Sequence, residues 1–497
     1  MDNFFKNKIS FKVEKEEKPK NLVVIPFENI EDIYKKVSWN YLNPKLKEFI
    51  KKILPKLKNY DSYLGYTEYG DFLLIKKQKL YNPETRNLIL LFRKILKFIK
   101  DNKIESFSLY LRDFTNDEYQ YKEIVNLICI NFILADFDFS KYYKTPPKEG
   151  WKEIKEIILH VPQKYLNEIK NYIKEALITG EEINRARFLS NLPGGELTPS
   201  LMVDIIKREA KNYEIKIKIL NKRDLEKIKA GGILGVSRGS RESPYIVILE
   251  IPNKGKELHY IGKGITFDTG GLQIKPSENM MDMHLDMSGA ASVFSATLLI
   301  RRLNIKANIK TIIPLAENMP GNEAYRPGDI LKTLSGKTVE IGHTDAEGRI
   351  ILADAISYSK KFFKPHLIVT IATLTGASMV ALGTKASALF TNNEKLQNLF
   401  IELGEKTGEY LWPLPLWEEY KKDIEANFAD ISNIGKSRYG GAIHGAIFLW
   451  EFAKPTDFVH IDIAPKMVSD GNDYLNKGST GFGVNLLKEF ARISDTL

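Results

Sequence analysis

The sequence predicts an α/β fold of two domains: a smaller N-terminal α/β domain, and a C-terminal α/β domain with a mixed, largely parallel central sheet flanked by helices. The chain has 497 residues, more than a single hydrophobic core normally organises. Apolar runs typical of strands alternate with amphipathic helical stretches along most of it. A Pro193-Gly194-Gly195 break follows a long helical region. These observations place the N-terminal domain at 1–160, a helical connector at 161–192 and the C-terminal domain at 193–497.

The N-terminal 160 residues mix strand and helix patterns. Apolar runs at 22–25, 72–75 and 106–111 are typical of strands, and apolar residues recur at helical spacing over 88–99. This predicts a small α/β domain. Its sequence contains no motif that carries chemistry.

The connector region is strongly helical. A helical pattern begins at Pro162 and continues to Gly180, and a second helical stretch runs from there to the Pro193 break. Thr198-Pro199 then predicts a new helix, because a hydroxyl can cap its first turn and proline loses no hydrogen bond there.

Strands and helices alternate in the C-terminal domain. The predicted strands are 216–220, 245–249, 259–261, 309–313 and 367–371, and the predicted helices are 288–303 and 349–363. Alternation of this kind is typical of a largely parallel sheet covered by helices.

Composition and termini indicate a cytoplasmic protein without membrane association. The first residues carry no apolar segment or cleavage site of a secretory signal. No apolar run reaches the roughly 20 residues that a membrane span requires. The single cysteine, Cys129, excludes an internal disulfide, and its apolar neighbours indicate a buried structural thiol.

The net charge of +10 is unevenly placed, with 33 Lys and Arg against 25 Asp and Glu in residues 1–180. Such a surplus suits a nucleic-acid surface. Glutamates interleave with the lysines, however, which favours an ordinary solvated surface.

Three segments hold the chemically interesting residues. Gly262–Gly271 is a glycine-spaced loop with Lys263 and Asp268, but it lacks the spacing of a phosphate-binding loop. Asp286 precedes a predicted helix, where it could be a cap. The third segment, Thr344–Arg349, contains Asp345 and Glu347 and resembles a solvated turn. Each segment alone is ordinary.

Together these segments predict a metal site. The carboxylates of Asp268, Asp286, Asp345 and Glu347 are all expected on loops at the ends of predicted strands, and they would repel one another unless cations lay between them. Two divalent ions would neutralise their four charges. Lysine can join them as a ligand when a metal displaces its proton. Oxygen ligands with one nitrogen suit zinc or manganese, with magnesium or cobalt as alternatives.

From about Arg185 to its C-terminus the sequence resembles the leucyl (cytosol) aminopeptidases. The matching motifs are Gly262–Gly271, Lys275-Pro276, Asp286–Ala291, Leu315–Pro320, Arg326–Asp329, Thr344–Arg349, Ala372–Ala377 and Ser479–Gly483. They occur in the family's order and spacing. The first 160 residues show no such likeness.

The resemblance implies a role for each site residue. Asp268 and Glu347 would bridge two metals, Lys263 and Asp286 would complete the tighter site, and Asp345 the more exchangeable one. A hydroxide shared by the metals would attack the peptide carbonyl, and the substrate's free amine would bind one metal. Lys275 would stabilise the tetrahedral intermediate, and Arg349 would hold a bicarbonate that acts as base.

The resemblance also implies a substrate pocket, an oligomeric state and an alternative function. The pocket would consist of Met283, Thr373, Leu374, Gly376, Ala464 and Met467, an apolar lining that suits Leu and similar side chains. The active protein would be a homohexamer, built as a dimer of trimers, and its substrates would be peptides.

Some family members also act as transcriptional or recombination factors, which keeps a DNA-binding function as the alternative. An inactive member is disfavoured by the complete residue set, and other two-metal hydrolases typically use several His ligands.

The sequence departs from the family pattern at two positions. His343 stands where Asn is usual, directly before Thr344, and His284 stands where a basic residue is common. We expect both to hydrogen-bond near the site rather than to bind metal.

Overall fold

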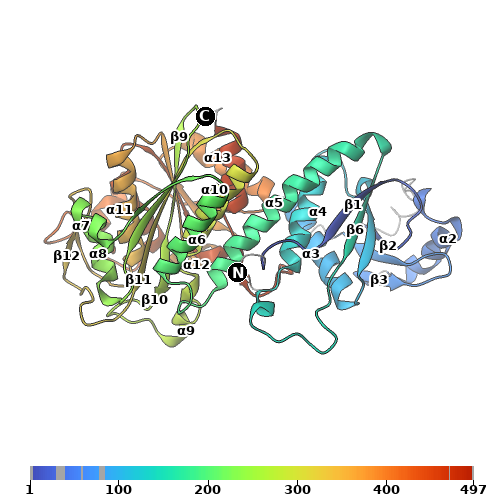
Figure 1. The fold of residues 1–497 in the computed structure, drawn as a ribbon, viewed down its shortest axis with the longest axis horizontal. Helices are drawn as coiled ribbons and strands as arrows, with labels where there is room; N and C mark the ends of the chain where they lie inside the picture. Colours follow the sequence, from blue (N-terminus) through green and yellow to red (C-terminus); the bar gives the residue numbers. More distant parts are fainter. Residues whose placement is uncertain (1–3, 29–39, 58–59, 78–83, 470, 495–497) are drawn as a thin grey trace. The chain divides into compact units, whose positions relative to one another are not determined.

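The computed structural model describes residues 4–28, 40–57, 60–77, 84–469 and 471–494 (Figure 1). By their contacts the residues form two compact units, Met1–Glu181 with Gly471–Asn476, and Glu182–Asp470 with Lys477–Leu497. Both units are α/β, which confirms the predicted fold class. The division between the units falls inside a helix, and the boundaries at 160 and 193 stay a prediction.

The first unit contains a six-stranded sheet in the order β1-β6-β5-β2-β4-β3. Its strands are β1 (Ser10–Lys15), β2 (Leu22–Phe27), β3 (Ser62–Gly65), β4 (Phe72–Lys76), β5 (Ser106–Tyr110) and β6 (Glu156–Val161). All neighbours are parallel except β3 and β4. Its helices are α2 (Pro44–Ile53), α3 (Glu84–Asp101) and α4 (Tyr121–Asp136). Cys129 lies fully buried in α4, and burial raises the pKa of its thiol, as expected of a structural residue.

A single helix, α5 (Leu166–Asn191), replaces the two helical stretches expected on either side of Gly180. The prediction of a break was wrong because this glycine serves close packing. A Cβ atom at Gly180 would lie 3.0 Å from the side chain of Ile133 in α4. The missing side chain therefore lets α5 approach α4, and the helix continues through it.

The second unit is built on a nine-stranded mixed sheet in the order β16-β15-β18-β14-β9-β11-β8-β7, with β10 beside β11. Its strands are β7 (Lys216–Leu220), β8 (Tyr245–Ile251), β9 (Glu257–Gly262), β10 (Gly264–Asp268), β11 (Asn308–Asn318), β14 (Leu367–Ala372), β15 (Ser387–Thr391), β16 (Leu411–Pro413) and β18 (Asp457–Asp462). The central strands β18, β14, β9 and β11 are mutually parallel. Strand β8 pairs antiparallel to β11, and β15 antiparallel to β18.

Helices cover both faces of this sheet (Figure 1). One face carries α6 (Pro199–Asn212), α10 (Ser288–Arg302) and α15 (Val484–Arg492), and the other carries α8 (Gly231–Val236), α11 (Glu347–Phe362) and α14 (Gly441–Ala453). The predicted start of α6 is confirmed, since Thr198 accepts a hydrogen bond from the Leu201 amide and Pro199 follows it. The further elements are α7 (Lys222–Ile228), α9 (Ser277–Met280), β12 (Ile330–Lys332), β13 (Thr338–Glu340), α12 (Gly376–Leu382), α13 (Glu394–Thr407), β17 (Ile431–Ser432), β19 (Val468–Ser469) and β20 (Gly478–Ser479).

The segment predicted as a glycine-rich loop contains a strand instead. Strand β10 continues the line of β9 past Lys263 and pairs parallel to β11. A Cβ atom at Gly262 would lie 2.4 Å from the Gly289 carbonyl oxygen, and one at Gly264 would lie 2.5 Å from that of Pro314. The glycines here allow close backbone approach, so their spacing did not indicate a loop.

One stretch of the described residues, Ser277–Arg302, has the length and apolar composition of a membrane-spanning helix. It is not an uninterrupted apolar run, because it contains Glu278, Asp282, Asp286, Arg301 and Arg302. Within this stretch 89% of the most apolar window is buried inside the protein. The core helix α10, which packs on β9, β11 and β14, accounts for its composition.

Candidate metal centre

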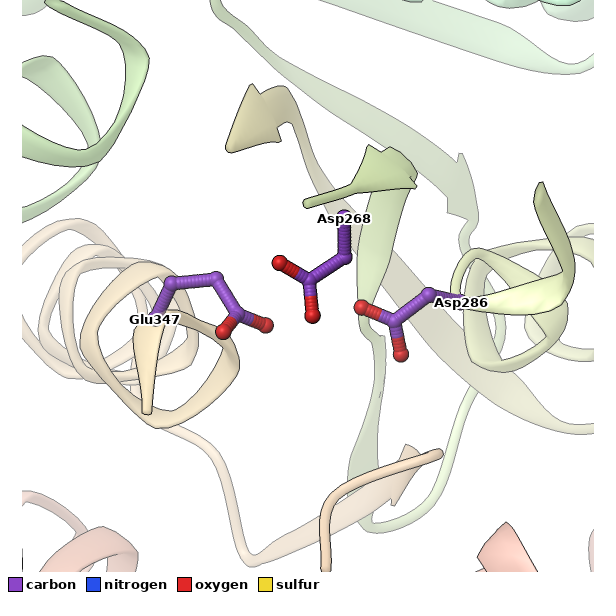
Figure 2. Close-up of side chains that lie close together, drawn as sticks. All are labelled: Asp268, Asp286 and Glu347. Atoms are coloured by element: carbon purple, nitrogen blue, oxygen red, sulfur yellow. The ribbon is translucent and has the colours of Figure 1, made fainter. Parts of the chain in front are cut away.

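Three buried carboxylates converge at the carboxyl end of the central strands. Asp268 is the last residue of β10, Asp286 lies two residues before α10, and Glu347 is the first residue of α11. One ligand oxygen from each lies within 4.8 Å of the others, and Figure 2 shows the three side chains pointing toward one another. These three predicted ligands, separated by up to 79 positions in the numbering, are therefore brought together by the fold.

Lys263 lies between β9 and β10 and reaches into this group. Its Nζ is 2.8 Å from Asp286 Oδ1 and 2.9 Å from Glu347 Oε1, and it donates a hydrogen bond to the Thr373 carbonyl oxygen. Burial lowers the pKa of Lys263, but the surrounding carboxylates raise it by more, so the ammonium form is stabilised. To bind a metal ion, Lys263 must lose this proton, which an incoming divalent charge can displace.

Lys275 joins Asp345 to the same cluster. Its Nζ lies 2.8 Å from Asp268 Oδ2 and forms an ion pair with Asp345 Oδ1. Asp345 is less buried than the other three carboxylates and lies outside the group of mutually close ligand atoms. Burial, together with Asp268 and Glu347, raises the pKa of Asp345 to about 7. The fold thus places Asp345 beside the three-carboxylate group rather than within it.

The donor set fits divalent cations. Asp286 Oδ2 and Glu347 Oε2 are buried and have no hydrogen-bond partner among the described residues. Burial raises the pKa of Asp286 well above its usual range, although Lys263 opposes this. Buried carboxylate oxygens without a partner are costly unless a cation meets them.

Asn318, at the end of β11, supports the cluster from behind. Its Nδ2 donates to Asp268 Oδ1 over 2.8 Å and to the Thr344 carbonyl oxygen over 3.0 Å. The Tyr325 hydroxyl donates to the same carbonyl over 2.5 Å. Sequence reasoning assigned neither residue a role. The sequence marked Asn318 only as part of the motif Leu315–Pro320, five residues beyond the predicted strand 309–313, and that did not reveal its partner.

Asn433 holds the turn that carries Asp345. Its Oδ1 accepts from the Gly342 amide over 2.8 Å, its Nδ2 donates to the His343 carbonyl oxygen over 2.7 Å, and its own carbonyl oxygen accepts from Arg349 Nη1 over 2.7 Å. This residue was also missed from the sequence.

The two histidines at the departures from the family pattern lie near the site. His343 Nδ1 accepts a hydrogen bond from the Asp345 amide over 3.1 Å, the bond that an Asn side chain makes in an Asx-turn. His343 can therefore shape this turn in place of Asn. His284 lies half-buried on the short 3-10 helix η7 (Met283–Leu285), and burial lowers its pKa.

The predicted pocket residues lie at the same end of the sheet. Thr373, Leu374 and Gly376 follow β14, and Ala464 and Met467 follow its parallel neighbour β18. Met283 opens η7, three residues before Asp286. Thr373 Oγ1 donates to Asp286 Oδ1 over 2.6 Å, so this threonine also orients a predicted ligand.

A helix-covered α/β sheet with buried carboxylates clustered at its carboxyl edge is an arrangement that suits metal-ion catalysis. The model of the cytosol aminopeptidase family, catalytic domain, matches residues 184–488. The chain belongs to the cytosol aminopeptidase family, as the resemblance predicted. It is therefore a peptidase, and its activity is that of a metal-dependent aminopeptidase.

Relatives and solved structures agree with this family. The chain is 39% identical to a probable cytosol aminopeptidase of Chlorobium limicola over 79% of this chain and 80% of the relative. It is 35% identical to that of Nitrosospira multiformis over 84% and 80%. The bottromycin maturation enzyme BotP in complex with Mn is 27% identical, with a TM-score of 0.82 over 95% of this chain and 99% of that one.

These matches extend into the N-terminal part, where the sequence showed no likeness. An alignment of 424 residues cannot lie wholly within the part after Arg185. The N-terminal part shows the pattern of apolar residues of a sheet core, and many different sequences can form such a core. This pattern therefore provides no distinctive motif by which the likeness could be recognised.

Proposed function

We propose that this aminopeptidase releases N-terminal residues, preferably Leu and other apolar residues, from peptides. The observation that carries the proposal is the convergence of Asp268, Asp286 and Glu347, with Lys263 and Lys275 beside them. The names of the relatives support the same reaction.

Lys263, Asp268, Asp286, Asp345 and Glu347 would hold two divalent ions, with zinc or manganese as the expected metals and magnesium or cobalt as alternatives. The manganese named for BotP supports this assignment. When bound, such ions polarise a peptide carbonyl and lower the pKa of water. Asp268 and Glu347 would be shared by both ions, as the family resemblance implies; Asp268 contacts Lys275, and Glu347 contacts Lys263.

Lys275 and Arg349 would take part in the reaction without binding metal. Lys275 places a positive charge beside Asp268 and Asp345, where it would stabilise the oxyanion of the tetrahedral intermediate. Arg349 is buried, which lowers its pKa to about 10, and it stays charged at neutral pH. Its Nε has no hydrogen-bond partner among the described residues, so a bicarbonate acting as base could satisfy it.

The two segments that follow β14 and β18 would supply the pocket for the first side chain of the peptide, with Met283 on η7 completing it. Leu374, Ala464 and Met467 give this lining an apolar character. Selection for Leu over smaller residues would rest on burial in that pocket.

Hydrolysis of a leucine chromogenic amide tests the proposed activity. We expect turnover with added zinc, manganese or cobalt, and loss of turnover after chelation, because the carboxylate cluster needs cations to polarise the substrate. Restoring the metal should restore the rate. Activity that is indifferent to chelator, or absent with every metal, would overturn the proposal.

Arg349→Lys tests the bicarbonate. Lysine keeps the charge but lacks the planar fork that can bind the Asn433 carbonyl and an anion together. In buffer freed of carbon dioxide, added bicarbonate should raise wild-type turnover, and the variant should be about 10²-fold slower and insensitive to it. An equal response of both proteins to bicarbonate would contradict the assignment.

A cytoplasmic homohexamer, a dimer of trimers, is the expected state, and light scattering on the purified protein would test it. The alternative of DNA binding predicts retention on DNA that weakens steeply with salt. The names of the relatives point to peptides.

A further inference from the structure

Asp462, the last residue of β18, is a fully buried carboxylate that accepts hydrogen bonds from four groups. Oδ1 accepts from the amides of Leu374 over 3.0 Å and Ala464 over 3.2 Å. Oδ2 accepts from the hydroxyls of Thr375 over 2.7 Å and Ser378 over 2.6 Å. Among the residues that the structure describes, these hydrogen bonds rather than a salt bridge stabilise the carboxylate.

The four donors belong to the two segments that carry most of the proposed pocket. Leu374, Thr375 and Ser378 come from the segment after β14, and Ala464 comes from the segment after β18. A single atom, Asp462 Oδ1, therefore ties the two segments together. Through Ser378 and Thr375, Oδ2 also holds the first turn of α12, because Thr375 caps that helix.

Segments after strands are the mobile parts of an α/β domain unless hydrogen bonds hold them. If the carboxylate moved, the backbone N–H of Leu374 or Ala464 would lose its hydrogen-bond partner. Because leaving a buried N–H unpaired costs free energy, the carboxylate holds the two segments at a fixed distance. Asp462 itself is fully buried and makes no hydrogen bond with the catalytic lysine or the metal-site carboxylates. Its hydrogen bonds reach the substrate only through the pocket segments, and its negative charge also raises the pKa of Arg349 against the effect of burial.

We propose that Asp462 is a positioning residue that sets the separation of the pocket walls and thereby the selectivity for large over small apolar side chains. The proposal rests on the proposed function, since it needs the pocket to receive the first residue of the peptide. A pocket of fixed width discriminates one methylene by roughly 10- to 200-fold, and a pocket with loosened walls loses part of that factor.

Asp462→Asn tests this role with little change of shape. The amide oxygen can still accept from Leu374 and Ala464, but an NH₂ group replaces the acceptor that faces the two hydroxyls. We expect the ratio of kcat/KM for leucine over alanine chromogenic amides to fall about tenfold. The change should lie mainly in KM for the leucine amide, with kcat less affected and metal content unchanged.

Asp354→Asn is the matched control. Asp354 is another fully buried carboxylate, and it accepts from the amides of Ile233 and Leu334 on the α8 side of the unit. Its substitution should lower the melting temperature in a similar way and leave the leucine-to-alanine ratio at the wild-type value. If Asp462→Asn does not fold, Ser378→Ala removes only one of the four donors and should shift the ratio in the same direction by a smaller factor.

The outcomes separate the two proposals. Wild-type protein that cleaves neither amide would overturn the proposed function and this inference with it. Active wild-type protein with an unchanged ratio in Asp462→Asn and Ser378→Ala, or an equal shift in Asp354→Asn, would overturn the positioning role alone.

Discussion

Replacing Asp268 by alanine is expected to abolish hydrolysis and to strip the site of bound metal. The Asp268 carboxylate belongs to the three-carboxylate group and also contacts Lys275 and Asn318. Its removal leaves the charges of the two lysines with fewer carboxylates to offset them, so a cation is repelled more strongly. Loss of residues that merely orient metal ligands costs about 10- to 100-fold in affinity, and loss of a shared ligand should exceed this.

Metal content by mass spectrometry and turnover of the leucine amide would be measured on the same preparation. Asp268→Asn provides a second variant, since its side-chain oxygen can keep the bonds from Gly270 and Asn318 that fix the end of β10. It should be folded and still lack metal. Full metal content in either variant would contradict the ligand assignment.

Lys275→Ala should lower turnover by about 10²–10³-fold while leaving metal content unchanged. The magnitude is that of removing one group that stabilises the oxyanion of an acyl-transfer intermediate. Lys275 carries positive charge beside Asp268 and Asp345, and the carboxylates raise its pKa despite the opposing effect of burial. Removing that charge does not weaken the attraction of the carboxylates for a cation.

Lys263→Ala is the informative comparison, because the two lysines differ in assigned role although both contact the cluster. Lys263 lies between Asp286 and Glu347 and is the proposed nitrogen ligand, so its loss should lower metal content. The same metal loss in Lys275→Ala would show that Lys275 is not acting on the substrate.

The sequence predicted the alternation of strands and helices correctly in both units. Runs such as 216–220 and 367–371 became β7 and β14, because buried strands need continuous or alternating apolar residues whatever lies around them. The start of α6 was predictable for a similar reason, since the cap at Thr198 is a local interaction. Predictions failed at Gly180 and at Gly264, where glycine serves contact with a residue distant in the sequence.

The candidate site, too, could be predicted from the sequence only in part. Residue chemistry indicated the ligands, because four carboxylates near strand and helix ends require cations wherever they meet. Distances between them were not predictable, and the fold grouped Asp268, Asp286 and Glu347 while leaving Asp345 beside them. The start of α11 also lies two residues earlier than predicted, which puts Glu347 inside the helix.

By itself, then, the sequence determined which atoms can bind metal and in what order they occur, since both follow from residue type and local pattern. Only the tertiary structure decided what holds them. Asn318 reaches Asp268 across 50 positions, and Asp462 reaches Leu374 across 88. A hydrogen bond between residues so far apart in the sequence depends on how the strands are ordered in the sheet, and no local pattern encodes that order.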